Sequence, residues 1–221
     1  MSPESTKSTP IPMDPGIYKD LFSTQTEEID AIKYRRAIGQ LHLLCKNSPR
    51  HHFCKSWRSS FRCLEVYTGK PYRWVLRYLA GSVHKGPIYC SSNSEPLAAY
   101  VDSDFGGCPR TLKSTSGYLL MLAGAPVSWK STLQSKTAQS TMEAEYVAAC
   151  LCSHEVVWTG ELLSQVGVTR SEPTVLLEDN QACIAFSEAS RIKSATKHIL
   201  LRFHYVREQA ESFEIWQILI L

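Results

Sequence analysis

Three stretches of the sequence carry carboxylates in settings where they could do chemistry. Asp102 ends an apolar stretch that is typical of a β-strand, and Asp104 follows two residues later. Asp179 follows a second apolar stretch, and Glu145 comes early in a long helical pattern. A carboxylate on the buried side of an element needs a charged partner, hydrogen bonds or a metal ion. These acids are therefore candidates for one shared metal site.

The chemistry expected of such a site is phosphodiester hydrolysis. If the strands of Asp102 and Asp179 are parallel neighbours, both carboxylates emerge at the same edge of the sheet, where α/β proteins place their ligands. Converging carboxylates repel one another, and divalent cations remove that penalty. Mg²⁺ prefers oxygen ligands, and two such ions activate a water and stabilise the leaving oxygen. We therefore expect two Mg²⁺ ions on Asp102, Glu145 and Asp179.

Neighbouring acids compete for two of these positions. Ser140 and Glu143 have the spacing of a capping box, which gives Glu143 a structural role at the start of the helix. Glu145 instead lies above small residues at helical spacing, which allow a helix to approach a sheet closely. Asp104 is expected in the loop beyond the first strand and stays the alternative to Asp102.

The elements around the acids predict an α/β domain with a mixed sheet. Short connections between the first three strands favour an antiparallel meander, and the later alternation of helix and strand favours parallel pairing. In chain order the expected elements are strands at 97–102, 116–122 and 126–131, a helix at 141–165, a strand at 173–177, helices at 180–186 and 199–210, and a strand at 212–221.

The preceding 91 residues predict two less regular segments. Residues 1–33 are polar and proline-rich and are expected to be a linker, and residues 34–91 form a connecting segment before the domain at 92–221. Within it, helical spacing predicts helices at 34–45 and at 72–79, the second closed by Gly81. Residues 46–71 mix basic and aromatic residues without periodicity, which favours an irregular segment over a nucleic-acid-binding patch. Cys45, Cys54 and Cys63 raise the alternative of a zinc-binding module, although a second ligand pair is missing.

Composition sets broad limits. The 221 residues, 43% of them hydrophobic, can form one core with a partial neighbour, and a net charge of +3 permits a polyanionic partner without demanding one. No apolar stretch is long enough to span a bilayer, and the N-terminus lacks the apolar core of a signal peptide. We expect no membrane partner, reduced thiols and an intracellular location, either cytoplasmic or nuclear.

Six motifs together resemble one family, the ribonuclease H domains of copia-type retrotransposon Pol polyproteins. The matching stretches are YVDSDFGG at 100–107, KSTSGY at 113–118, VSWKS at 127–131, STMEAEY at 140–146, EDNQA at 178–182 and TKHI at 196–199. Their order along the chain is that of the family. Residues 10–44 are similar to the segment that joins the reverse transcriptase thumb to this domain.

The resemblance implies a fold, a reaction and partners. The fold is the ribonuclease H fold, a five-stranded mixed sheet with helices on both faces. The reaction is Mg²⁺-dependent cleavage of the RNA strand of an RNA–DNA hybrid during reverse transcription, next to the reverse transcriptase portion of the same polyprotein. By motif position Asp102, Glu145 and Asp179 are the metal-binding acids. Hybrid phosphates need cations nearby, and the lysines within or beside the motifs are Lys113, Lys130, Lys136 and Lys197.

Two departures from the family define the alternatives. The family has a fourth acid after its last strand, and this sequence stops at Leu221 before reaching it, with that strand expected to be truncated. Residues 46–71 also lack the family's pattern. The chain therefore resembles a degenerate C-terminal fragment, and the alternative to an active nuclease is an inactive remnant that folds or binds nucleic acid. An integrase-type enzyme is disfavoured, because integrases place their glutamate last.

Overall fold

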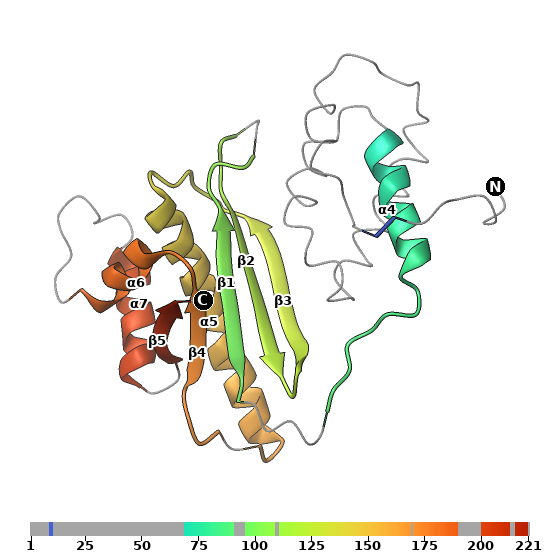
Figure 1. Cartoon of the computed structure of the whole chain (residues 1–221). Helices are drawn as coiled ribbons and strands as arrows, with labels where there is room; N and C mark the ends of the chain where they lie inside the picture. The colour runs from blue at the N-terminus through green and yellow to red at the C-terminus, as the bar shows by residue number, and fades with distance from the viewer. Residues whose placement is uncertain are drawn as a thin grey trace. The chain divides into compact units, whose positions relative to one another are not determined.

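The structure is a computed structural model that describes residues 9–10, 69–90, 96–108, 111–168, 170–189, 200–212 and 215–220. The chain divides into two compact units, Met1–Gly86 and Pro87–Leu221. In the first unit, helix α4 (Gly69–Gly81) contains the helix predicted at 72–79 and ends at the predicted glycine (Figure 1). The predicted helix at 34–45 and the three cysteines of the zinc alternative lie outside the described residues. So does the predicted irregular segment at 46–71 up to residue 68, whereas residues 69–71 belong to α4.

The second unit is built on a mixed sheet of five strands, as predicted. The strands are β1 (Ala98–Asp104), β2 (Thr115–Leu122), β3 (Ala125–Leu133), β4 (Thr174–Glu178) and β5 (Ile215–Ile220). Their order across the sheet is β3-β2-β1-β4-β5. The first three strands pair antiparallel as a meander, whereas β4 pairs parallel with both β1 and β5. The central strand β1 thus joins the antiparallel and the parallel halves.

Three helices cover the sheet: α5 (Thr141–Gln165), α6 (Gln181–Glu188) and α7 (Leu200–Glu211). They contact one another and pack on the same face, so helices on both faces are not found among the described residues of this unit. The reason is the handedness of the connections. Both crossovers, from β3 to β4 and from β4 to β5, step in the same direction across the sheet, and right-handed crossovers then place their helices on one face.

The core lies between this face and α5. Ala99, Val101 and Leu176 alternate with more exposed residues along β1 and β4, and they pack with Tyr146 and Val156 of α5. All five side chains are at most 2% exposed. The strand period of two therefore sets which residues of β1 and β4 face the helix.

The start of α5 follows the predicted capping pattern with one variation. The Ser140 hydroxyl accepts a hydrogen bond from the backbone N–H of Glu143 at 3.1 Å. The Glu143 carboxylate accepts the N–H of Gln139 at 2.7 Å, one residue before the cap. Both bonds satisfy N–H groups near the start of the helix. The helix ends near Gln165, as predicted, and Gly167 adopts a φ of 83° that favours glycine.

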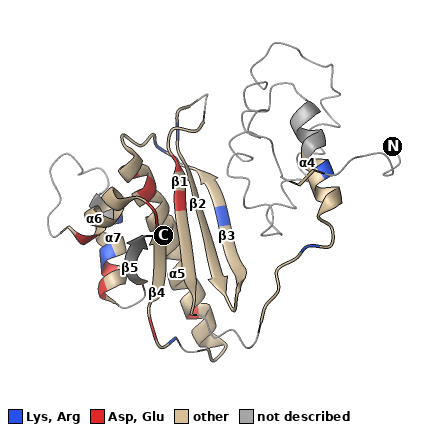
Figure 2. Cartoon of the chain, viewed as in Figure 1, with Lys and Arg blue, Asp and Glu red and all other residues tan. Residues whose placement is uncertain are grey.

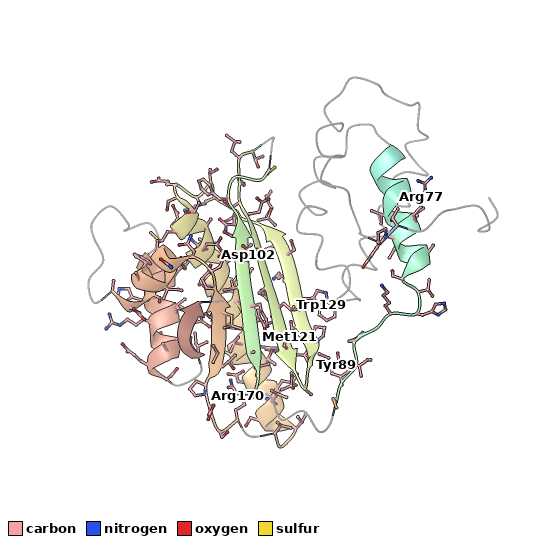
Figure 3. The ribbon with its side chains drawn as sticks, viewed as in Figure 1. Arg77, Tyr89, Asp102, Met121, Trp129 and Arg170 are labelled. Carbon is pink, nitrogen blue, oxygen red and sulfur yellow. The ribbon has the colours of Figure 1, made fainter. Side chains whose placement is uncertain are left out.

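The far end of α5 fixes the start of β4. Arg170 lies between them, and its guanidinium donates to the Thr174 hydroxyl at 2.9 Å. A Cβ at Gly160 would come within 2.1 Å of that guanidinium, so the absence of a side chain there leaves space for Arg170. Figure 3 places Arg170 at the opposite end of the sheet from Asp102. The amino-terminal end of β4 is thus held by α5, and its carboxyl end points to the region of Asp102.

The predicted end of the first strand is wrong. Strand β1 continues to Asp104, which pairs with Thr115 of β2, so Asp104 is the last strand residue and not part of the following loop. The run of two aspartates and a serine is atypical of a strand, yet the antiparallel ladder with β2 holds it.

Candidate metal centre

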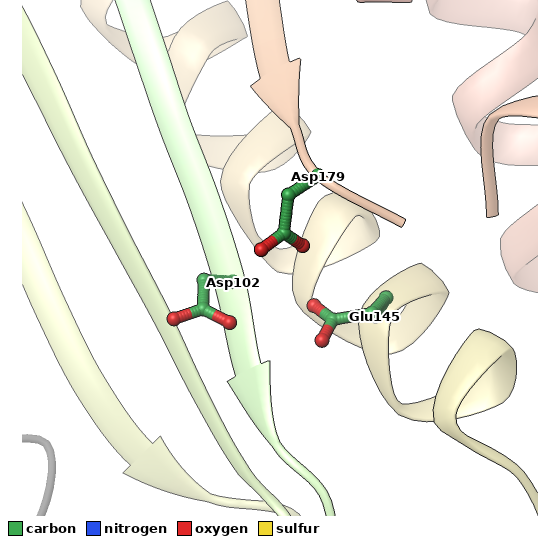
Figure 4. Close-up of side chains that lie close together, drawn as sticks. All are labelled: Asp102, Glu145 and Asp179. Carbon is green, nitrogen blue, oxygen red and sulfur yellow. The ribbon is translucent and has the colours of Figure 1, made fainter. Parts of the chain in front are cut away.

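Three of the predicted acids come together at one end of the sheet. One carboxylate oxygen of each of Asp102, Glu145 and Asp179 lies within 4.8 Å of the others. Figure 4 shows the three side chains pointing toward a common space from β1, from α5 and from the end of β4. Asp102 is half-buried, Glu145 is 6% exposed and Asp179 is exposed. The group is therefore buried on the helix side and open to solvent at Asp179.

The register of β1 and β4 explains why the two aspartates meet. The parallel ladder between these strands ends at the pair Tyr100 and Leu177. Asp102 and Asp179 each lie two residues beyond that pair, so they stand at the same level of the sheet. Because the ladder stops before them, no ladder hydrogen bonds join the backbone at Asp102 to the backbone at Asp179.

Helix α5 supplies the third carboxylate from its first turns. Glu145 lies four residues before Ala149, which is fully buried, and seven before Cys152, which is also fully buried. These small side chains let the helix approach the sheet closely, as the sequence predicted. Figure 2 shows acidic segments at the same end of β1, of α5 and of the turn after β4.

A fourth acid lies beside this group and was not predicted. Glu178, the last residue of β4, is fully buried. Its Oε1 accepts the backbone N–H groups of Asp179 and Asn180, both at 3.1 Å. Its Oε2 is buried and makes no hydrogen bond with the described residues. Burial, and then the neighbouring charge of Glu145, raise the pKa of Glu178 to about 8.

A signal for Glu178 exists in the sequence. The strand period places residues 174, 176 and 178 on one face, and the apolar Leu176 marks that face as buried. The resemblance directed attention to the following aspartate, and Glu178 was treated only as the end of an apolar strand.

The two competing acids, Asp104 and Glu143, do not point into the group of converging carboxylates. The Asp104 carboxylate lies against the turn after β1, where a Cβ on Gly107 would come within 1.7 Å of its Oδ2. Glu143 bonds to the backbone before the helix, as described above. Among the described residues, the group of converging acids contains neither of them.

The predicted substrate lysines differ in their environments. The Lys113 ammonium donates to the carbonyl of Ser135 at 2.6 Å and thereby joins the loop after β1 to the loop after β3. Lys130 on β3 and Lys136 after it are exposed. Lys197, with the rest of its motif, lies outside the described residues.

The donor set favours a hard divalent cation. All three converging side chains offer carboxylate oxygens, which are the ligands that Mg²⁺, Mn²⁺ and Ca²⁺ prefer. Three carboxylates this close repel one another, and a cation between them offsets the repulsion. Buried Cys152 and Cys183 lie near Glu178, but burial raises the pKa of each thiol far above its usual range, so both stay protonated and are poor ligands.

Comparisons with known proteins relate this chain to transposon proteins. It is 34% identical over 212 residues to the retrovirus-related Pol polyprotein from transposon TNT 1-94 of Nicotiana tabacum. The match covers 92% of this chain and 16% of the relative. It is 30% identical over 207 residues to the retrovirus-related Pol polyprotein from transposon RE1 of Arabidopsis thaliana. That match covers 93% of this chain and 14% of the relative. The chain thus spans about one sixth of the length of these relatives. No family model matches it.

Solved structures give weaker likenesses. Ribonuclease H1 from the halophilic archaeon Halobacterium salinarum is 16% identical with a TM-score of 0.41, and it covers 57% of this chain and 86% of that one. LC11-RNase H1 in complex with an RNA/DNA hybrid is 9% identical with a TM-score of 0.41, over 57% and 83%.

The helices within the described ranges include none long and apolar enough for a membrane span. The transposon relatives confirm the resemblance that the motifs carry, because they match over more than nine tenths of the chain. The chain is homologous to one segment of the copia-type, retrovirus-related Pol polyproteins of transposons.

Proposed function

We propose that residues 87–221 act as a ribonuclease H domain, which hydrolyses the RNA strand of RNA–DNA hybrids with two Mg²⁺ ions during reverse transcription. The observation that carries the proposal is the convergence of Asp102, Glu145 and Asp179 at the carboxyl ends of β1 and β4. Homology to transposon Pol polyproteins supports the same reaction. The reverse transcriptase portion of such a polyprotein is the proposed partner, and an intracellular location belongs to the same proposal.

Each acid has a part in this proposal. Asp102 and Asp179 approach from two strands and Glu145 from the helix, so the three can hold cations from different directions. When bound, the cations supply an activated water and stabilise the leaving oxygen. The exposure of Asp179 leaves that side of the group open to an incoming phosphodiester.

Contacts to the hybrid are proposed for exposed lysines. Lys130 lies on β3 and is solvent-exposed, so its ammonium is available to a phosphate. Lys113 is proposed as an indirect contributor, because its ammonium already bonds to the carbonyl of Ser135. Lys197 is proposed to contact the hybrid on the basis of its motif alone.

The test is a cleavage assay with the purified chain and a labelled RNA–DNA hybrid. We expect RNA cleavage with Mg²⁺, none with a chelator, and none with single-stranded RNA or double-stranded RNA of the same sequence. The variant D102N, which keeps the size of the side chain, is expected to lower the cleavage rate by about 100-fold or more.

The outcomes separate the two alternatives. A folded chain that leaves hybrid RNA intact at every Mg²⁺ concentration contradicts the nuclease. If it still binds the hybrid, the inactive remnant is the better description. Cleavage at the parent rate in D102N points to a contaminating nuclease and counts against the assigned site.

A further inference from the structure

We propose that Glu178 is a positioning residue of the acidic centre, which holds the Asp179 carboxylate in place for a divalent cation through the hydrogen bonds that its Oε1 accepts. This inference rests on the proposed function only in that the three acids bind a cation. It assigns a role to a side chain that the motif pattern leaves without one.

The geometry of the β4–α6 turn carries the proposal. Asp179 is the first residue after β4, and its backbone is not part of the ladder with β1, which ended at Leu177. The Oε1 of Glu178 accepts the N–H of Asp179 itself and the N–H of Asn180. Two successive N–H groups are thereby fixed to one buried oxygen on the strand that leads into them.

The next residue continues the same arrangement. Asn180 is the N-cap of α6, and its Oδ1 accepts the N–H of Cys183 at 3.0 Å. Asp179 is thus held between a strand end and a helix start, and Glu178 supplies the link between the two. Because the carboxylate of Asp179 is exposed, no burial of its own side chain fixes its direction.

The burial of the Glu178 carboxyl group carries an energetic cost. A fully buried carboxyl group with one oxygen that lacks a hydrogen bond costs free energy in the folded chain. A leucine would fill a similar volume without that cost. The hydrogen bonds of Oε1 to the turn are the compensation that the structure provides.

The test measures Mn²⁺ binding, not cleavage, by electron paramagnetic resonance of free Mn²⁺ and by calorimetry on the full chain. E178Q keeps an oxygen acceptor at the same distance from the backbone, whereas E178D keeps the carboxyl group but withdraws the acceptor by one methylene. E178M removes both. We expect E178Q to retain the affinity of the parent chain and E178D and E178M to weaken it about 10-fold to 100-fold, the range found for groups that orient metal ligands.

A matched control is Glu155 on α5, which accepts a hydrogen bond from the Ser128 hydroxyl at 2.5 Å and lies outside the acidic group. E155Q and E155M are expected to leave Mn²⁺ affinity unchanged, even if they lower the melting temperature. Far-UV circular dichroism checks that each variant is folded. If E178M does not fold, the difference in Mn²⁺ affinity between E178Q and E178D still tests whether Glu178 positions Asp179.

Several results would overturn the proposal. Parent-like affinity in E178D excludes positioning through the acceptor. A loss of affinity in E178Q that E178D does not share indicates that Glu178 acts through its carboxyl group and not through the position of its acceptor. Equal losses in the two variants show that an acceptor at this position is not sufficient. A parent chain that binds no Mn²⁺ at millimolar concentration removes the metal centre and this role with it. A parent chain that binds Mn²⁺ but leaves hybrid RNA intact contradicts the nuclease alone, and the variants still decide the role of Glu178.

Discussion

The two aspartates of the acidic centre are held by different means. Asp102 lies inside β1, where its backbone pairs with Gly117 of β2 in an unbroken antiparallel ladder from Ala98 to Asp104. Asp179 lies beyond the end of β4 in a turn, and its N–H bonds to the side chain of Glu178. The sheet itself positions the first acid, whereas a neighbouring side chain positions the second.

This difference indicates which substitutions should disturb the acidic centre. A backbone ladder is shared among many hydrogen bonds, so the loss of any one of them leaves the backbone of Asp102 in place. The turn after β4 depends on a few specific acceptors, Glu178 and Asn180, each of which one substitution can remove. Changes near Asp102 should therefore alter stability, and changes near Asp179 should alter metal binding.

The largest expected effect tests the proposed metal ligands. We expect D102N to lower the rate of hybrid cleavage by about 100-fold or more, since it removes a charge that holds the cation. D104N, two residues along the same strand, is expected to keep most of the activity, because Asp104 is outside the converging group. Single-turnover cleavage rates compare the two. Equal loss in both variants would mean that the centre includes Asp104.

A change in the β1–β2 loop should affect stability and not the centre. In G107A the new Cβ would meet the Asp104 carboxylate, and the required shift is expected to lower the free energy of unfolding by about 1–3 kcal/mol. Urea denaturation measures that loss, and the Mn²⁺ affinity is expected to stay close to that of the parent. A matched control is G167A, where a positive φ and open space predict a loss of about 1 kcal/mol from backbone strain alone.

Removal of the α6 cap should give a smaller and mixed effect. N180A loses the acceptor for the N–H of Cys183, which is expected to cost about 1 kcal/mol of stability. Because the same residue follows Asp179, Mn²⁺ affinity should also fall, but less than in E178D. A variant that loses stability with no change in affinity would separate the cap from the turn that holds Asp179.

The pH dependence of stability is the subtlest test. The folded chain holds a proton on Glu178 up to a pKa of about 8, whereas the ordinary value is 4.5. The folded state thus binds more protons than the unfolded state between these values, so this group's contribution to stability falls as pH rises through that window. Urea denaturation with a chelator present, from about pH 5 to pH 9, should show this fall, and E178Q should reduce it. An unchanged slope in E178Q would assign the effect to other groups.

The sequence predicted the parts of the fold that depend on local signals. The capping pattern of Ser140 and the helical period predicted the bounds of α5, and apolar stretches separated by turn residues predicted all five strands. The period also placed Glu145 on the side of Ala149 and Cys152, where it is buried. These features depend on neighbours a few residues apart, which the sequence lists directly.

Features that depend on pairing between distant segments were missed. The ladder with β2 extends β1 to Asp104 despite residues that disfavour a strand. Among the described residues, the helices lie on one face of the sheet, an arrangement that follows from the strand order, which local patterns do not contain. Glu178 was missed for a different reason, because the motif drew attention to Asp179 and an acid at a buried strand position contradicts ordinary patterning.

The end of β4 is bonded more extensively on one side than on the other. Its ladder with β1 stops at Leu177, but its ladder with β5 includes Glu178, which pairs with Ile220. Local opening of β5 would therefore loosen the residue that holds Asp179 and leave Asp102 in its ladder. Cation binding and docking of β5 are thus thermodynamically linked, and each should increase the equilibrium constant of the other.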